Sequence, residues 1–521
     1  MALRLGAWAS AAWLVLAGSV ALFIGTLLAA LPLQGAALLL ALGAFLGVLV
    51  APWPVLLWGF LATVAFLVGP LQYAGGFSKA FWLPYLMGVL MGVRVLTDGL
   101  GARPQSPSVA MRRLDGPMCM GWALMGVLGL VAAVSSAAHG VGLLQAVVAG
   151  KEYLFLWGLP LAFSLGLLNT DHLKRLWPAM AVWLAVQVLV VVWQRLVVAP
   201  HRGGDAPWDA VVGLFAGNAN GAGGSGTMAM VSLWAAACVM TAWRAGLLRW
   251  PWAAMAAASA LAACALAEVK VAVLLLPLLA VVVLYEPTTA VRQAAWNFPM
   301  RALGGLGVLC ASLALMWAHQ QQFSASGSAD SNSSLRYAQT VMERNLDTQS
   351  VADEHGQLTR LGALQYWWKR QSVSDMPGWT MGHGIGAVRR SNLAPGSVVR
   401  GLRIEPGRSS AVILLWETGV LGLLSWVGFS LAWMVAAARM MSAPKSPHEA
   451  VCLKAAFMII GVTLLSLPYG ADLFEAPHLA VAYLLGVGMV WGAHHQRCQG
   501  TQSLQPTRMS APVDVPLRGV T

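Results

Sequence analysis

Four basic residues outside the apolar stretches have the chemistry needed to hold a phosphorylated lipid. Arg360 and Arg408 lie in one long polar segment, and Arg202 and Lys270 lie in shorter ones. Arginine presents a rigid fork of donors that matches phosphate oxygens, whereas lysine acts as a point charge. An enzyme acting on a lipid diphosphate needs such groups to bind it and to stabilise the leaving diphosphate. The sequence also allows structural roles: a surface salt bridge for Arg360, an interfacial position for Arg408, and pairing of Lys270 with Glu268.

Two other residues could transfer a proton beside such a clamp. Glu417 lies one or two turns inside an apolar stretch, where a carboxylate is costly and usually has a task. It could be the base for an acceptor hydroxyl, an anchor for an arginine, or a structural hydrogen-bond acceptor at a helix entry. His383 stands between two glycines and could be a base near neutral pH, although a loop histidine is often simply exposed.

A glycine-rich loop adds Asn218 and Asn220 to the candidate site. It could present backbone N–H groups to phosphate, or it could be a flexible turn. The six cysteines lie in or beside apolar stretches and in the C-terminal tail, which indicates neither a disulfide framework nor a zinc site. We therefore expect no metal and no cofactor.

The elements that must position these residues are membrane helices. Of the 521 residues, 58% are hydrophobic and 10% are charged, against roughly 25% charged in soluble proteins. The apolar residues form blocks of about 20, the length that crosses a bilayer as a helix. This pattern predicts an all-α polytopic membrane protein with about 12–14 transmembrane helices. The net charge of +12 is spread between the blocks, which argues against nucleic acid as a partner.

Fourteen apolar stretches are candidate spans, the first of which we read as retained rather than as a cleaved signal peptide. They lie near residues 8–30, 33–50, 53–70, 80–97, 117–136, 153–168, 175–198, 223–243, 250–267, 271–285, 302–318, 411–438, 453–468 and 477–493. The close pairs 33–50/53–70 and 250–267/271–285 could each be a single span.

Basic residues in short loops predict the orientation. With the N-terminus in the cytoplasm, inner loops and termini hold 17 of the 32 basic residues, and ten more lie in segment 319–409. The short outer loops then hold only Lys79, Lys151, Arg195, Arg202 and Lys270. Segments 199–222, 267–271, 319–409 and 469–476 would all emerge on the outer side, where they could build one site.

The chain divides accordingly into four parts. Residues 1–318 form transmembrane helices 1–11, 319–409 an outer loop domain, 410–494 helices 12–14, and 495–521 a disordered cytoplasmic tail. Within the loop domain, apolar residues at helical spacing predict helices over 334–348 and 358–370, and prolines and glycines predict turns over 375–386.

Several of these segments resemble the O-antigen ligase and O-antigen (exopolysaccharide) polymerase superfamily. The run 360–368 (RLGALQYWW), then Pro377 and the turn 382–386 (GHGIG), is similar to the signature in which an arginine opens an amphipathic helix. Residues 417–422 (ETGVLG) are similar to the family's E-x-G-x-x-G, and 213–220 (GLFAGNAN) to its G-x-F-x-x-N-x-N loop. The order and spacing of these motifs carry the resemblance, which covers about residues 195 to 430.

The resemblance implies a metal-independent membrane glycosyltransferase of the GT-C type at the periplasmic face of the bacterial inner membrane. Such enzymes take a glycan from undecaprenyl diphosphate, held by arginines, and pass it to lipid A-core or to another glycan. The ligases carry a histidine nine residues before the glutamate, where this chain has Arg408, and an upstream arginine is replaced by Lys270. Ligase and polymerase both remain open.

Two other classes of protein fit the same sequence. A solute transporter or a lipid-linked sugar flippase can have twelve to fourteen helices, although such proteins usually place ionisable groups near the midplane in repeated halves. A structural subunit of a polysaccharide export machine is a third class. Membrane lipids are expected partners in every case.

Overall fold

A computed structural model of the chain describes residues 50–101, 115–201, 210–219, 224–284, 360–371, 376–389, 395–400 and 409–502, together with residues 47, 305, 307, 310, 312, 314, 358 and 407. The chain forms two compact units, residues 1–56 and 57–521. Every contact described below lies within the second unit. All regular structure in the described ranges is helical.

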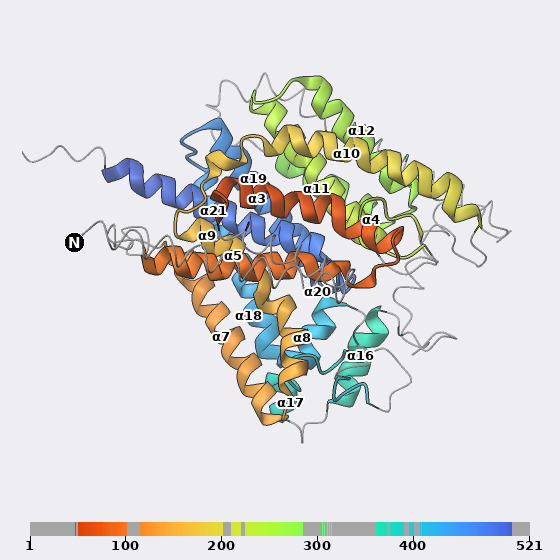
Figure 1. The fold of residues 1–521 in the computed structure, drawn as a ribbon, viewed down its shortest axis with the longest axis vertical. Helices are drawn as coiled ribbons and strands as arrows, with labels where there is room; N and C mark the ends of the chain where they lie inside the picture. Colours follow the sequence, from red (N-terminus) through yellow and green to blue (C-terminus); the bar gives the residue numbers. More distant parts are fainter. Residues whose placement is uncertain are drawn as a thin grey trace, which may run out of the picture. The chain divides into compact units, whose positions relative to one another are not determined.

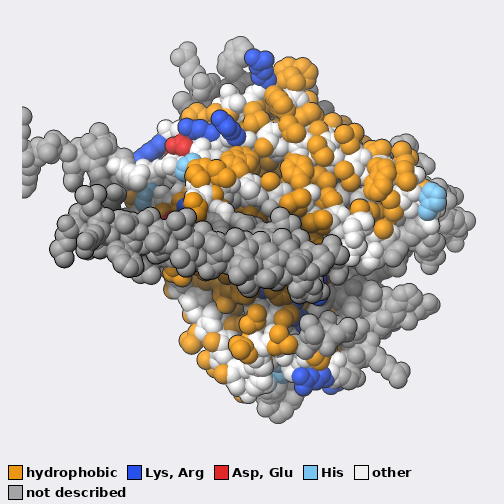
Figure 2. Space-filling model, viewed as in Figure 1, with side chains coloured by type: hydrophobic (Ala, Val, Ile, Leu, Met, Phe, Trp, Pro, Cys, Tyr) orange, Lys and Arg blue, Asp and Glu red, His pale blue; other side chains and the backbone are white. Residues whose placement is uncertain are grey.

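Eight helical segments in the described part of the chain are long and apolar enough to cross a membrane. They are Trp53–Tyr73, Lys79–Asp98, Gly116–Ala138, Leu143–Ser164, Thr170–His201, Ser225–Arg244, Ser410–Met441 and Pro447–Ser466. Large apolar side chains lie on their outer faces, and Figure 2 shows hydrophobic groups covering most of the described surface in this view, with few charges. The protein is therefore a polytopic α-helical membrane protein, as predicted.

Figure 1 shows the helices. In chain order they are α3 (Trp53–Ala62), the π-helix η1 (Thr63–Leu67), α4 (Val68–Tyr73), the 3-10 helix η2 (Ser78–Phe81), α5 (Trp82–Gly101), α7 (Gly116–Ala138), α8 (Leu143–Leu154), the 3-10 helix η3 (Phe155–Trp157), α9 (Gly158–Ser164), the 3-10 helix η4 (Thr170–Leu173), α10 (Leu176–Trp193), the π-helix η5 (Gln194–Val198), the 3-10 helix η6 (Ala199–His201), α11 (Ser225–Arg244), α12 (Trp250–Leu266), α13 (Val271–Leu284), α16 (Arg360–Arg370), α17 (Met376–Met381), α18 (Ser410–Met441), α19 (Pro447–Ser466), α20 (Asp472–Glu475) and α21 (Pro477–Gln502).

Eleven of the predicted spans coincide with helices, whereas those near 8–30, 33–50 and 302–318 lie almost wholly outside the described residues. The doubtful pair 250–267/271–285 is two helices, α12 and α13. The loop helix predicted over 358–370 is present as α16. The helix predicted over 334–348 lies outside the described residues.

Two boundaries were predicted wrongly. The span predicted from residue 153 begins in the structure at Leu143, so Lys151 lies inside α8 and is 1% exposed instead of lying in an outer loop. The turn predicted over 375–386 opens with the short helix α17. In both places tertiary packing overrides the local sequence signal. Taken alone, the polar pair Lys151-Glu152 predicts the end of a membrane helix, and Pro377 predicts a turn.

Helix α18 packs along α7 and α19, and α21 packs along α19 and α9. An aromatic cluster joins these helices: Trp122 lies 5.8 Å from Trp157, 6.4 Å from Trp433 and 6.2 Å from Trp491, between ring centroids. Interlocked rings of this size fill the space between helices and give the bundle a rigid core.

Helix α18 is interrupted at Gly419, whose φ of 65° and ψ of −168° are not helical. The interruption removes helical donors from the carbonyls that precede it, and the turn 382–386 supplies replacements. His383 donates its backbone N–H to the Trp416 carbonyl at 2.7 Å, and Gly384 donates to the Glu417 carbonyl at 3.1 Å. The broken helix is thus completed by a segment far away in sequence.

The same turn is bound to the C-terminal turn of α7 and to α8. Ser135 Oγ donates to the Gly382 carbonyl at 2.8 Å, the Ile385 N–H donates to Ser136 Oγ at 3.1 Å, and Gln145 Nε2 donates to the Ile385 carbonyl at 3.1 Å. We call this end of the helices the α7–α8 end. Figure 1 shows α16 and α17 beside it.

The loop at 210–215 is built into the bundle by two glutamines. Gln194 Oε1 accepts the N–H groups of Val212 at 2.8 Å and Gly213 at 2.5 Å, and Gln187 Oε1 accepts that of Leu214 at 2.7 Å. The first part of this loop is therefore an ordered, buried structure. Phe215 lies 4.6 Å from His478 between ring centroids, which connects the loop to the start of α21.

We predict that Gly419→Ala destabilises the protein by at least about 1–2 kcal/mol, because its φ lies in the left-handed region and a Cβ there would overlap the Thr380 carbonyl. Thermal unfolding in detergent measures the effect. The matched control is Gly129→Ala on α7, where a Cβ has nothing within 4 Å. Equal melting temperatures for the two variants would show that the interruption is not needed for folding.

Candidate functional site

The candidate site lies around the Glu417 side chain, two turns into α18 and just before the interruption. The carboxylate is 1% exposed. Tyr153, from the end of α8, donates its hydroxyl to Glu417 Oε2 at 2.8 Å. The backbone N–H of Gly386 also faces the carboxylate. A buried carboxylate needs such donors, because an unpaired charge away from water is strongly unfavourable.

Three charged side chains form an ion network beside it. Lys151 Nζ lies 2.7 Å from Glu152 Oε1, and Arg389 Nη2 pairs with Glu152 Oε2. Both Lys151 and Arg389 also act electrostatically on Glu417. Two cations and two carboxylates therefore balance in one buried cluster, which we call the Glu417 cluster: Lys151, Glu152, Tyr153, Arg389 and Glu417.

An aromatic wall encloses the lysine. Its Nζ lies 5.2 Å from the ring centroid of Phe81, 5.0 Å from that of Trp82 and 5.4 Å from that of Tyr85. The electron-rich faces of the rings stabilise the ammonium group in a place that water does not reach. Lys151 also donates to the Val148 carbonyl at 3.1 Å. These contacts hold the lysine in place as a structural charge.

Arg389 is the accessible cation of the cluster, with 24% of its side chain exposed. Its backbone is held by the Gly396 N–H, which donates to the Arg389 carbonyl at 2.9 Å, and its own N–H donates to the Gly386 carbonyl at 3.1 Å. Its Nε is buried and has no hydrogen-bond partner among the described residues. The exposed part of the guanidinium can receive an anion while Nη2 stays paired with Glu152.

Of the residues singled out from the sequence, Glu417 and His383 belong to adjacent, hydrogen-bonded segments. Their side chains meet different neighbours. The His383 ring lies 5.2 Å from the ring of His139 and 5.6 Å from that of Trp416, and Gln371 donates to its Nε2 at 3.0 Å. The histidine is half-buried at the end of α16, not freely exposed.

Lys270 and Asn218 lie on other elements. Lys270 is exposed in the tight turn between α12 and α13. Glu268, in the same turn, pairs with Arg195 at 3.1 Å. Asn218 is exposed at the end of the loop whose preceding N–H groups are bound by Gln187 and Gln194. Those N–H groups are consumed within the protein, so they cannot bind a phosphate.

The remaining candidates are not described at the level of their side chains. Arg360 is the first residue of α16, which packs against α18, but its side chain lies outside the description. Arg202, Asn220 and Arg408 are outside the described residues altogether. Their roles as diphosphate ligands stay predictions. Among the described residues, no three His, Cys, Asp or Glu side chains are grouped to hold a metal ion.

Sequence reasoning missed four members of the cluster: Lys151, Glu152, Tyr153 and Arg389. A signal for the first three was present, because a Lys-Glu-Tyr triplet is embedded in an otherwise apolar region. Charged groups inside membrane spans are costly and usually have a partner and a task. Arg389 is one of several arginines between residues 360 and 408, and nothing in the sequence distinguishes it from the others.

No protein family model matches the chain, and no curated protein sequence is detectably similar to it. The fold and the site together define its class as a polytopic helical membrane protein with a buried, charge-balanced cluster beside an interrupted helix.

We predict that Glu152→Gln destabilises the protein by about 3–5 kcal/mol, since it leaves the buried Lys151 and the partly exposed Arg389 without their shared carboxylate. Thermal unfolding in detergent measures it. The control is Asp171→Asn, which removes the exposed partner of Lys174 and should cost less than about 1 kcal/mol. Adding Lys151→Met to Glu152→Gln should recover part of the loss. Equal effects of the two single substitutions would contradict a buried network.

Proposed function

We propose that the protein is a metal-independent membrane glycosyltransferase that moves a glycan from undecaprenyl diphosphate to an acceptor at the periplasmic face of the inner membrane. It would act as a polysaccharide polymerase or as an O-antigen ligase. One observation supports this most directly. The two segments that resemble the family motifs, 382–386 and 417–422, are hydrogen bonded to each other around Glu417.

In this proposal Glu417 is the base. It accepts the proton of the acceptor hydroxyl, whose oxygen attacks the anomeric carbon as the bond to the diphosphate breaks, with inversion. Tyr153 holds the carboxylate in place by donating its hydroxyl to Glu417 Oε2 at 2.8 Å. His383 is proposed to assist from the adjacent segment, where its backbone N–H is bound to the Trp416 carbonyl and its ring lies beside those of His139 and Trp416.

The leaving group is a diphosphate, and its developing charge needs cations. Arg389 supplies an accessible guanidinium at the Glu417 cluster. Arg360, Arg408, Lys270 and Arg202 are proposed to complete the clamp. The charge balance of the cluster supports this use of Arg389, because Lys151 and Glu152 are already paired and part of the arginine side chain is exposed.

A second candidate function is transport, and one observation favours it. A membrane helix interrupted at a glycine, with buried ionisable groups beside the break, is also how transporters bind ions and substrates. Reconstituted protein distinguishes the two functions. Flux of a lipid-linked sugar across the bilayer without any new glycosidic bond would favour transport.

We predict that Glu417→Gln lowers kcat for glycan transfer by about 10²–10⁴-fold, because the amide cannot accept the proton. Membranes supplied with a radiolabelled undecaprenyl-diphosphate oligosaccharide and an acceptor measure the product. Arg389→Ala should lower transfer to a similar degree, and the exposed Arg400 of the same segment provides the control. Arg400→Ala should leave transfer unchanged. Transfer at the wild-type rate by Glu417→Gln would exclude this residue as the base.

A further inference from the structure

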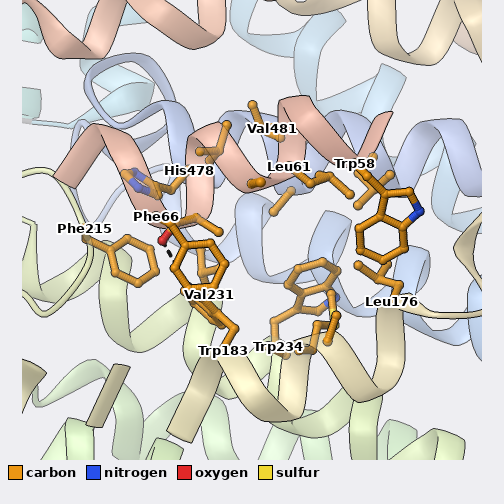
Figure 3. A pocket seen from close by; sticks show the side chains of 18 residues that line it. Trp58, Leu61, Phe66, Leu176, Trp183, Phe215, Val231, Trp234, His478 and Val481 are labelled. Atoms are coloured by element: carbon orange, nitrogen blue, oxygen red, sulfur yellow. Dashed lines mark hydrogen bonds between the residues drawn. The ribbon is translucent and has the colours of Figure 1, made fainter. Parts of the chain in front are cut away.

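A second site, separate from the Glu417 cluster, is an elongated apolar cavity of about 290 Å³. It lies between α3 with η1, α10, α11 and α21, as Figure 3 shows. Its lining residues run from Leu176 to Trp183 on α10 and from His478 to Leu485 on α21. Seven residues of helix rise about 10 Å. For comparison, an engineered apolar cavity of about 150 Å³ binds benzene, so this one has room for a longer hydrocarbon.

The cavity is next to the lipid. Phe66, in η1, is 42% exposed and forms part of the lining. The wall it belongs to is a π-helical segment, and such segments frequently mark functional positions. One wall of the cavity therefore reaches the apolar outer surface, where we expect the hydrocarbon chains of the bilayer.

Its two ends differ in chemistry. Trp58 and Leu176 lie at one end, and Phe215 and His478 lie at the other (Figure 3). Two of the indole N–H groups in the walls, those of Trp183 and Trp234, are satisfied by the protein itself. Trp183 donates to the Ala65 carbonyl at 3.2 Å, and Trp234 lies beside the same space.

Trp234 is satisfied in the same way, donating its indole N–H to the Ala455 carbonyl at 2.9 Å. At the end of the cavity opposite Trp58, His478 is the polar side chain of the lining. It is 4% exposed and lies near the Val64 carbonyl. Neither of its ring nitrogens has a hydrogen-bond partner among the described residues.

The chemistry of these nitrogens follows from the imidazole itself. A neutral imidazole carries a proton on one ring nitrogen and a lone pair on the other. The lone pair needs a donor. An ester or an alkane chain offers none, whereas a hydroxyl group does.

We propose that this cavity binds a lipid alcohol: a hydrocarbon chain along the cavity whose hydroxyl donates to His478. The observations that carry it are the apolar volume beside the bilayer and a buried acceptor at one end. The inference does not depend on the glycosyltransferase proposal, because no residue of the Glu417 cluster lines the cavity.

The test compares 1-decanol with decane as probes on the purified full-length protein in detergent. We expect 1-decanol to raise the melting temperature about 1–3 °C more than decane does. His478→Phe keeps the ring against Phe215 but removes the lone pair, so the difference between the two probes should disappear. Equal shifts by both probes in the wild-type protein, or no shift by either, would overturn the proposal.

Filling the cavity provides the second variant. Ala482→Phe on α21 places a ring in the space and should abolish the response to both probes. Val231→Phe does so from α11, in case the first variant does not fold. The matched control is Ala133→Phe on the exposed face of α7, which should respond as the wild-type protein does. A wild-type response from a folded, filled variant would show that the probes bind elsewhere.

Discussion

The structure of the site depends on the interruption of α18 at Gly419. In a membrane every backbone carbonyl needs a donor from within the protein. The interruption exposes the carbonyls of Trp416 and Glu417, and the turn 382–386 satisfies them. The turn is also bound to α7 and α8. The single break in α18 therefore fixes the relative positions of α7, α8 and α18 and of the segment that precedes α18.

Close backbone approach makes this arrangement possible. A Cβ at Gly382 would overlap the backbone of Glu417 and Thr418, and a Cβ at Gly419 would overlap that of Thr380. The glycines of the two motifs therefore have a common physical role, which is to let two chain segments touch. The glutamate is carried into the protein interior by this contact, and Tyr153 and Arg389 meet it there.

The Glu417 cluster shows how a membrane protein keeps charges out of water. Lys151 and Arg389 both pair with Glu152 and both act electrostatically on Glu417, and the lysine is further enclosed by three aromatic rings. Such a network is sensitive to substitution, since loss of Glu152 would leave two cations without their shared carboxylate. Arg389 differs from the other members of the Glu417 cluster because part of its side chain is exposed. It can therefore bind a ligand while its ion pair with Glu152 stays in place.

Apolar blocks of membrane length were sufficient to predict the helices, because a span in lipid has no alternative to internal hydrogen bonding. The sequence also singled out Glu417 and the turn 382–386, since a carboxylate in an apolar stretch and a cluster of glycines are visible locally. It did not show that Gln187 and Gln194 occupy the backbone N–H groups of residues 212–214 in the glycine-rich loop.

What the sequence by itself determined is therefore the class of protein, its helices and the carboxylate at the start of α18. Only the tertiary structure decided which groups surround that carboxylate. Tyr153 is 264 residues away from Glu417 in the chain, and its hydroxyl reaches the carboxylate only because α8 and α18 meet beside the interruption. Partners of this kind are set by helix packing, and a periodicity of apolar residues identifies a helix without saying which neighbour it will have.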